Sequence, residues 1–307
     1  MKEIILKPER EDIGLRLDLF LLKRFLAQNI SSSRNNVQKL IKTGKVTSLK
    51  PVLLKSHYKI KEDDIFKVIL EEEISESPLA ENIPLKILYE DEDIAVIDKP
   101  EGLVVHPGAG NQKHTLVNAL LYHFKELSLV NPLRPGIVHR LDKDTSGVMV
   151  IAKNNSSYWN LTKQFAQHSI KREYVAIVKG KIEFDEDILE LPISRHLRDR
   201  KKQWVAFGKN SRYAKTSYKT VLRREDASLI KLIPFTGRTH QLRVHLAFIG
   251  HPILGDPKYS KDKTFGRLAL HAYLLGFLHP KKNRYAEFVS EIPQEFLDYF
   301  GIKKLKI

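Results

Sequence analysis

The segment IVHRLDKDTSGVMVIAK at residues 137–153 holds a cluster of reactive side chains between two apolar runs. Both apolar runs are rich in β-branched residues, which predicts two strands around a polar loop. Gly147 allows the chain to turn back into the second strand. Loops that a rigid scaffold holds in place are where catalytic groups concentrate. We therefore expect the catalytic residues to lie in the loop at 139–147, between two strands of a sheet.

Three explanations compete for this loop, in which Asp142 and Asp144 lie two positions apart. Its Asp, Thr, Ser and Gly residues could cap their own backbone in a turn. The two carboxylates could hold a metal, although a hard cation prefers more oxygen ligands than this loop offers. One carboxylate could instead act as a nucleophile, with flanking basic residues lowering its pKa and guiding an anionic substrate. The loop alone leaves these alternatives open.

Strand and helix patterns mix irregularly on both sides of the loop. Residues 87–100 are predicted to form two strands around a turn at 91–93, and 137–153 two more around the reactive loop. Strands without a strict βαβ alternation predict an α+β domain with a mixed, largely antiparallel central sheet flanked by helices. Other strand-like runs are 173–180, 216–222, 228–233 and 285–289, and helical spacing occurs at 115–127, 154–168 and 239–249.

The N-terminal part has a different pattern. Leucines at helical spacing predict a helix over 15–26, and the serines at 31–33 can cap a second helix that ends at Gly44. The segment EEEISESPLAE at 71–81 has five acids and little to bury, so it is predicted to be a linker. We expect three parts, at residues 1–75, 76–84 and 85–307. The second helix region carries Arg34, Lys39, Lys42 and Lys45.

Composition restricts the function. Lys and Arg total 52 against 37 Asp and Glu, a formal charge of +15, which predicts a polyanionic partner. The absence of cysteine excludes disulfides, Cys-ligated zinc, iron–sulfur clusters and thiol nucleophiles. The first residues lack the apolar run of a signal peptide, and no stretch approaches the ~20 apolar residues of a membrane span. We expect a soluble, cytoplasmic protein.

Three further segments are candidates for function. In FTGRTHQLRVHLAFIGHPILGDPKY at 235–259, a helix capped by Thr239 would carry Arg243 on the same face and leave Arg238 at its start, able to pair with a distant carboxylate. In KREYVAIVKG at 171–180, an aromatic residue on a strand is more often core than functional. Residues 195–224 have eleven Lys or Arg and one acid, with aromatic residues among them, which suits an RNA surface or a solvated hairpin.

Together these segments resemble the RluA-type pseudouridine synthase family, and most closely its RluD-like branch, which modifies large-subunit ribosomal RNA. The family signature HRLDxDTSG stands here as HRLDKDTSG. KPEGLVVHPGAGN at 99–111, RPGIVHRLD at 134–142, TGRTHQLRVH at 236–245 and HPILGDPKY at 251–259 also match. The N-terminal helices are similar to an S4-type RNA-binding module. TSLKPVLL after GKV, KEDD at 61–64 and PISRHLRDRKK at 192–202 depart from the usual patterns.

The resemblance implies a role for several residues. Asp142 corresponds to the catalytic aspartate, Tyr174 to the tyrosine that stacks on the target base and can take a proton from it, and Arg238 to the basic residue paired with the aspartate. Arg140 corresponds to the residue that fills the gap left by the extruded uridine. The expected RNA-binding residues are Arg140, His139, Arg34, Lys39, Lys42, Lys45 and Arg243.

The resemblance implies an RNA isomerase that needs neither a metal nor a cofactor, because the reaction moves a bond without net oxidation or hydrolysis. The carboxylate could attack C1′ or C6 of the nucleotide, or abstract a ribose proton. The expected partner is ribosomal RNA or an assembling large subunit, with a monomeric enzyme as the default. The alternatives are a non-catalytic RNA-binding or ribosome-assembly protein and, more remotely, a metal-dependent nucleotide hydrolase.

Overall fold

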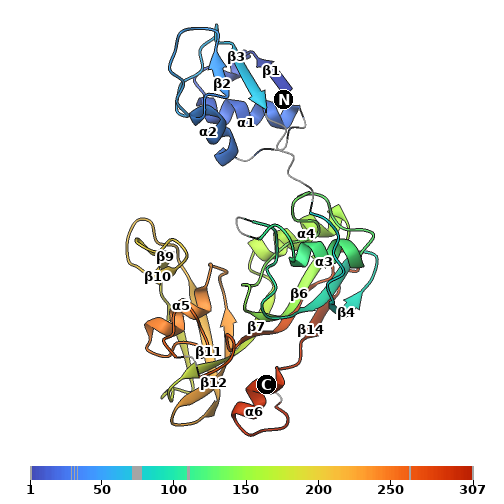
Figure 1. Cartoon of the computed structure of the whole chain (residues 1–307), viewed down its shortest axis with the longest axis vertical. Coiled ribbons are helices and arrows are strands. Elements are labelled where there is room, and N and C mark those ends of the chain that lie inside the picture. The colour runs from blue at the N-terminus through green and yellow to red at the C-terminus, as the bar shows by residue number, and fades with distance from the viewer. Residues whose placement is uncertain are drawn as a thin grey trace. The chain divides into compact units, whose positions relative to one another are not determined.

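The computed structural model describes residues 2–28, 30, 32, 34–70, 78–108, 111–262 and 264–305. The chain divides into two compact units, Met1–Glu76 and Ser77–Ile307 (Figure 1). Residues 71–77, which hold much of the predicted acidic linker, lie outside the described residues. Among the helices that the structure describes, none has the length and apolar character that crossing a bilayer requires.

The first unit packs two helices on a small antiparallel sheet of strand order β1-β3-β2. Large apolar side chains from both helices and the central strand, including Phe20, Phe25 and Phe66, are fully buried between these layers. Gly44 ends the second helix with φ +72°, as the sequence predicts. The elements are β1 (Lys2–Leu6), a 3-10 turn (Arg10–Asp12), α1 (Leu17–Ala27), α2 (Arg34–Lys42), β2 (Val46–Ser48) and β3 (Phe66–Leu70).

The second unit is built on a nine-stranded sheet of order β4-β5-β6-β13-β7-β12-β11-β8, with β14 paired to β13. Among the described strands, β6 and β13 form the one parallel pair, so the predicted mixed, largely antiparallel sheet is confirmed. Its strands are β4 (Lys86–Glu90), β5 (Ile94–Lys99), β6 (Ser146–Ala152), β7 (Lys171–Lys179), β8 (Glu186–Glu190), β11 (Lys215–Arg223), β12 (Ala227–Pro234), β13 (Leu270–Leu278) and β14 (Tyr285–Val289), and β9 (Ile193–Arg195) and β10 (Gln203–Val205) form a separate hairpin.

Helices cover the two halves of this sheet separately (Figure 1). One core joins β5 and β6 to α3 (Leu116–His123) and to α4 (Asn155–Ala166). The other joins β7 and β12 to α5 (Gln241–Phe248) and to α6 (Gln294–Tyr299). All seven residues of β6 are buried, because both faces of this central strand are covered. The reactive loop thus enters one of the most rigid parts of the sheet.

The start of β6 is fixed by close backbone packing against β13. Gly147 has φ +118°, and a Cβ at this position would lie 2.2 Å from the carbonyl oxygen of Ala272. Only glycine fits so close an approach. One residue earlier, the Ser146 hydroxyl bonds to His271 Nδ1 (2.9 Å) and accepts a hydrogen bond from Arg267 (2.6 Å). The loop that precedes β6 is therefore anchored at its C-terminal end.

Several elements differ from the sequence predictions. Residues 137–141 do not form a strand: Ile137 makes an isolated bridge to Ile151, and His139 Nε2 accepts the Val150 N–H at 3.0 Å. Strand β13 was not predicted because its apolar run has both faces covered and shows little alternation. The hairpin strands β9 and β10 have three residues each in a highly charged stretch, which leaves no clear periodicity. Strand β8 and helix α6 were also not predicted.

Candidate active site

A cavity of about 350 Å³ opens in the second unit where three sequence-distant segments meet. The segments are the loop before β6, strand β7 with the turn that precedes it, and the loop that leads into α5. Asp142, Tyr174, Arg238 and Arg243 all line this cavity. His139, Arg140, His168, Arg172 and His240 also line the cavity.

The backbone around Asp142 is held by a buried lysine. Lys99 is fully buried and donates to the carbonyl oxygens of Pro100 (2.7 Å), Leu103 (3.0 Å) and Lys143 (3.0 Å). Burial lowers the pKa of Lys99 to about 8, with nearby Asp144 acting in the opposite direction. The lysine ties the KPEGL segment to the reactive loop, a function that the sequence did not reveal.

Asp142 is paired with Arg243, which corrects the expected pairing with Arg238. Arg243 Nη1 donates to Asp142 Oδ2 at 3.1 Å. The Nε of Arg238 instead donates to the carbonyl oxygen of Tyr213 at 3.1 Å. Helix α5 is capped at His240 and begins at Gln241, so Thr239 is not its cap. Arg238 therefore lies in the loop, while Arg243 projects from the first helical turn.

Arg243 is fixed from its other side by a second carboxylate. Its Nε and Nη2 donate to the two oxygens of Asp256 at 2.7 Å each, and the side chains of both residues are almost completely buried. Burial alone would raise the pKa of Asp256, but the two bonds from Arg243 and backbone N–H groups lower it below its usual value. Asp142 keeps 22% of its side chain exposed. The Arg243 guanidinium therefore orients the accessible Asp142 carboxylate, while the inaccessible Asp256 carboxylate balances the charge of Arg243.

Asp256 belongs to the HPILGDPKY segment at 251–259. Its Oδ1 also accepts the backbone N–H groups of Lys258 (2.8 Å) and Tyr259 (3.1 Å), so the turn and the ion pair form together. The sequence offers one signal for this pairing, a carboxylate in a tight turn shortly after the helix that carries Arg243.

The loop before α5 is held by the side chain of Gln241. Its Oε1 accepts from Thr236 Oγ1 (2.7 Å) and from the Arg238 N–H (3.0 Å). Its amide donates to the Lys215 carbonyl (3.0 Å) and to Thr216 Oγ1 (2.9 Å). Because this buried amide has partners on every side, the loop geometry is specified by one side chain.

His240 adds a neutral ring to the site. Its backbone has φ +56°, a conformation that residues other than glycine rarely adopt. Its Nδ1 forms a hydrogen bond with Tyr259 Oη at 2.8 Å. Its Nε2 lies 3.8 Å from Asp142 Oδ2. Burial lowers the pKa of His240 to about 4, with Asp142 opposing the shift. Arg243 is therefore the cation in contact with Asp142 near neutral pH.

Tyr174 lines the cavity from β7 and is half-buried. Burial raises the pKa of its phenol, so the hydroxyl stays protonated near neutral pH. His139 stacks on Phe165 with ring centroids 4.5 Å apart, and burial lowers its pKa to about 3. Arg140 is exposed at the cavity. For His139 and Arg140, contact with RNA stays a prediction.

The expected RNA-binding residues of the first unit lie on α2 and just after it. Arg34 is exposed, and its guanidinium pairs with the buried Asp18 at 3.0 Å. Asp18 also binds Arg16 at 3.0 Å, so one buried carboxylate orients two surface guanidiniums. Lys39 and Lys42 are exposed and Lys45 is half-buried. Their contact with RNA also stays a prediction.

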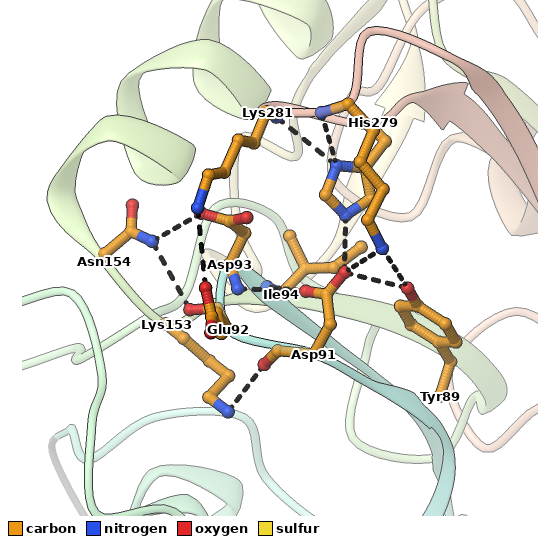
Figure 2. A network of polar contacts seen from close by, with 10 residues as sticks. Tyr89, Asp91, Glu92, Asp93, Ile94, Lys153, Asn154, His279 and Lys281 are labelled. Carbon is orange, nitrogen blue, oxygen red and sulfur yellow. Dashed lines mark hydrogen bonds and ion pairs between the residues drawn. The ribbon is translucent and has the colours of Figure 1, made fainter.

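A second polar cluster, formed by Asp91, Asp93 and His279, lies outside the cavity (Figure 2). Their potential ligand atoms lie within 4.8 Å of one another. Asp91, however, already accepts five hydrogen bonds: from Tyr89 Oη (2.8 Å), His279 (2.9 Å), Lys282 (2.8 Å) and the backbone N–H groups of Asp93 (2.9 Å) and Ile94 (3.0 Å). The carboxylate is thus occupied by protein donors. The cluster fastens the β4–β5 turn to the segment that follows β13.

Comparison with known proteins gives a consistent result. The profile of the family described as RNA pseudouridylate synthase matches residues 93–248. The chain is 44% identical to an uncharacterized RNA pseudouridine synthase of Aquifex aeolicus, over 93% of each chain. It is 42% identical to ribosomal large subunit pseudouridine synthase D of Zymomonas mobilis, over 93% of this chain and 92% of that protein. The solved structure of human RNA pseudouridylate synthase domain containing 4 is similar, with TM-score 0.55 and 29% identity over 69% of this chain and 90% of that one.

Proposed function

This chain belongs to the RNA pseudouridylate synthase family, and we propose that it isomerises specific uridines of large-subunit ribosomal RNA with Asp142 as the reacting carboxylate. The observation that carries the proposal is the Asp142–Arg243–Asp256 chain. It leaves one aimed and partly exposed carboxylate at the wall of a cavity large enough for a nucleotide base.

The reaction requires an ionised carboxylate at a defined position. Pseudouridine formation breaks the bond between C1′ and N1, turns the base, and joins C1′ to C5. Asp142 can assist by attacking the nucleotide or by taking a ribose proton, and both routes need the charged form. Arg243 favours that form and fixes the direction of its oxygen atoms.

The target uridine has to leave its stack to reach this cavity. Extruding a base costs a few kcal/mol, which stacking and edge hydrogen bonds recover. Tyr174 offers a flat phenol ring at the cavity wall, and the exposed Arg140 is suited to fill the gap that the uridine leaves. To take the C5 proton after the base has rejoined, the phenol first has to give up its own proton, which its raised pKa opposes. Arg238, although not paired with Asp142, contributes positive charge at the cavity.

We propose that two basic surfaces bind the RNA around the target uridine. The first is the β9–β10 hairpin with the loop that follows it, where Trp204, Phe207 and Tyr213 are 39%, 75% and 56% exposed among basic residues. Aromatic rings among cations suit unstacked bases and their phosphates. The second is the N-terminal unit, which we interpret as an S4-like module that uses Arg34, Lys39, Lys42 and Lys45 as RNA-binding residues. The three-part division at 1–75, 76–84 and 85–307 is part of this proposal.

Ribosomal RNA is proposed as the substrate for two reasons. Relatives that match over most of their length are named as ribosomal large subunit pseudouridine synthases. The net charge of +15 also suits a large polyanion. We further propose that the enzyme acts as a monomer, in the cytoplasm where ribosomal subunits assemble, and without a metal or organic cofactor.

The test is Asp142→Asn, which keeps the shape of the side chain and removes its charge. We expect tritium release from C5-labelled uridine in ribosomal RNA to stop, while the Kd for RNA is unchanged. Asp187→Asn makes the same chemical change on the exposed edge strand β8 and should leave the rate unaltered. Continued tritium release by Asp142→Asn would refute the assignment. No release by the wild-type protein on any ribosomal RNA would favour a non-catalytic role in ribosome assembly.

A further inference from the structure

Arg172 also lines the cavity that holds Asp142 and Tyr174. It lies on β7 two residues before Tyr174, so the two side chains project from the same face of the strand. Both are half-buried, whereas Glu173 between them is buried on the opposite face and pairs with Lys171 and Lys231. The strand therefore presents a cation and a phenol side by side to the bound base.

The charge of Arg172 is not balanced by the protein. Among the described residues, no carboxylate forms an ion pair with its guanidinium. Nη2 donates to the Pro234 carbonyl at 3.1 Å, and Nε is buried without any hydrogen-bond partner. Arg243 differs sharply, because its charge is balanced by two carboxylates, Asp142 and Asp256. A half-buried guanidinium without a protein carboxylate as partner is free to pair with an anion bound in the cavity.

The rings next to this cation are neutral, and the nearby charge that opposes it is the Asp142 carboxylate, which acts on Tyr174 in the opposite direction. Burial lowers the pKa of His139 to about 3, with Arg172 adding to the shift, so the neighbouring imidazole is neutral. Burial also keeps the Tyr174 phenol protonated. Gly237 lies against the guanidinium, since a Cβ there would be 3.1 Å from Arg172 Nη1. The loop before α5 thus makes room for the guanidinium without supplying a negative charge.

The reaction itself generates an anion at this place. When the bond between C1′ and N1 breaks, both of its electrons stay with the base, and the charge spreads over the uracil ring and its two carbonyl oxygens. The base then forms a bond from C5 to C1′, loses the C5 hydrogen as a proton, and gains a proton at N1. Atoms and electrons are therefore conserved, and the intermediate base carries one negative charge.

We propose that Arg172 stabilises the detached uracil anion, as a fixed cation directed at the carbonyl oxygens of the base. The inference rests on the proposed function, because it takes the Asp142 cavity as the place where uridine reacts. A preorganised donor aimed at developing charge acts mainly in the transition state and contributes little to RNA binding. The effect should therefore appear in the rate of bond breakage and not in the Kd.

The experiment compares two leaving groups. A ribosomal RNA segment that the wild-type enzyme converts is prepared with uridine or with 5-fluorouridine at the target position, and loss of the parent nucleoside is followed by mass spectrometry under single-turnover conditions. Fluorine makes the base more acidic and its anion more stable, so this substrate depends less on external stabilisation. Arg172→Met should slow the uridine reaction about 100-fold and the 5-fluorouridine reaction about tenfold, with the Kd for RNA unchanged.

Two further variants keep the test decisive. Arg172→Lys retains the charge and should recover part of the lost rate, and it serves as the main comparison if Arg172→Met fails to fold. Arg284→Met removes one exposed arginine between β13 and β14 and should leave both substrates unaffected. Equal slowing of the two substrates by Arg172→Met, or a loss confined to the Kd, would overturn the proposal. Failure of the proposed function would be seen separately, as persistent activity of Asp142→Asn.

Discussion

Replacing Asp256 with asparagine tests how much the buried ion pair contributes to the site. The substitution keeps the shape of the side chain but leaves Arg243 with one counterion, Asp142, in place of two. Removing one partner of a fully buried pair costs about 3–5 kcal/mol of unfolding free energy. The asparagine oxygen can still accept one hydrogen bond, so we expect the lower limit of about 3 kcal/mol.

For a unit the size of residues 77–307, about 3 kcal/mol corresponds to a Tm lower by roughly 6–12 °C. The assay is thermal unfolding by calorimetry, with Asp226→Asn as the control. Asp226 pairs with Arg224 on the surface, with more than half of its side chain exposed, and its pair should contribute less than about 1 kcal/mol. A Tm decrease for Asp256→Asn no larger than for the control would refute the reasoning.

The pH dependence gives a second check on the same pair. The folded-state pKa of Asp256 is lowered relative to its unfolded value, which is near 3.8. Its contribution is therefore fully present above the unfolded pKa and is lost as the pH falls through the folded pKa. The stability difference between wild type and Asp256→Asn should be constant near neutral pH and should shrink below pH ~4. A difference that grows on acidification would contradict the assignment.

Three other outcomes are expected. Gly147→Ala should lower the unfolding free energy by about 3 kcal/mol or more in denaturant titrations, because its Cβ would overlap the Ala272 carbonyl at φ +118°. Tyr174→Phe should keep the Kd for RNA but slow product formation after the base has detached, which single-turnover kinetics would detect as an accumulating intermediate. Phe207→Ala should weaken RNA binding by about 1–3 kcal/mol in a filter-binding assay, whereas an unchanged Kd would remove the hairpin loop from the RNA surface.

The candidate site residues come from motifs that lie next to strong secondary-structure signals. The resemblance implied roles for Asp142 in HRLDKDTSG and Tyr174 in KREYVA, and both residues line the cavity. The resemblance to pseudouridine synthases is confirmed by the family profile and by relatives at 36–44% identity. The mixed, largely antiparallel sheet was predictable as well, since most of its strands are bounded by clear turns.

The arginine partner of Asp142 was misassigned because helix starts cannot be fixed to a residue from sequence. Thr239 was expected to cap the helix, but Gln241 takes over the preceding loop through four hydrogen bonds. The cap is His240, one residue later, and in this arrangement Arg243 pairs with Asp142 while Arg238 donates to a carbonyl oxygen. The roles of Lys99 and Asp256 depend on contacts between segments distant in sequence, which no local pattern encodes.

The central claim is that this chain converts uridines in large-subunit ribosomal RNA through Asp142. Its most direct test is a map of pseudouridines, at single-nucleotide resolution, in ribosomal RNA from cells with the wild-type gene, without the gene, and with Asp142→Asn. We predict that the same large-subunit positions lose pseudouridine in the second and third strains. Retention of those pseudouridines in the Asp142→Asn strain, or an identical map in all three strains, would contradict the account.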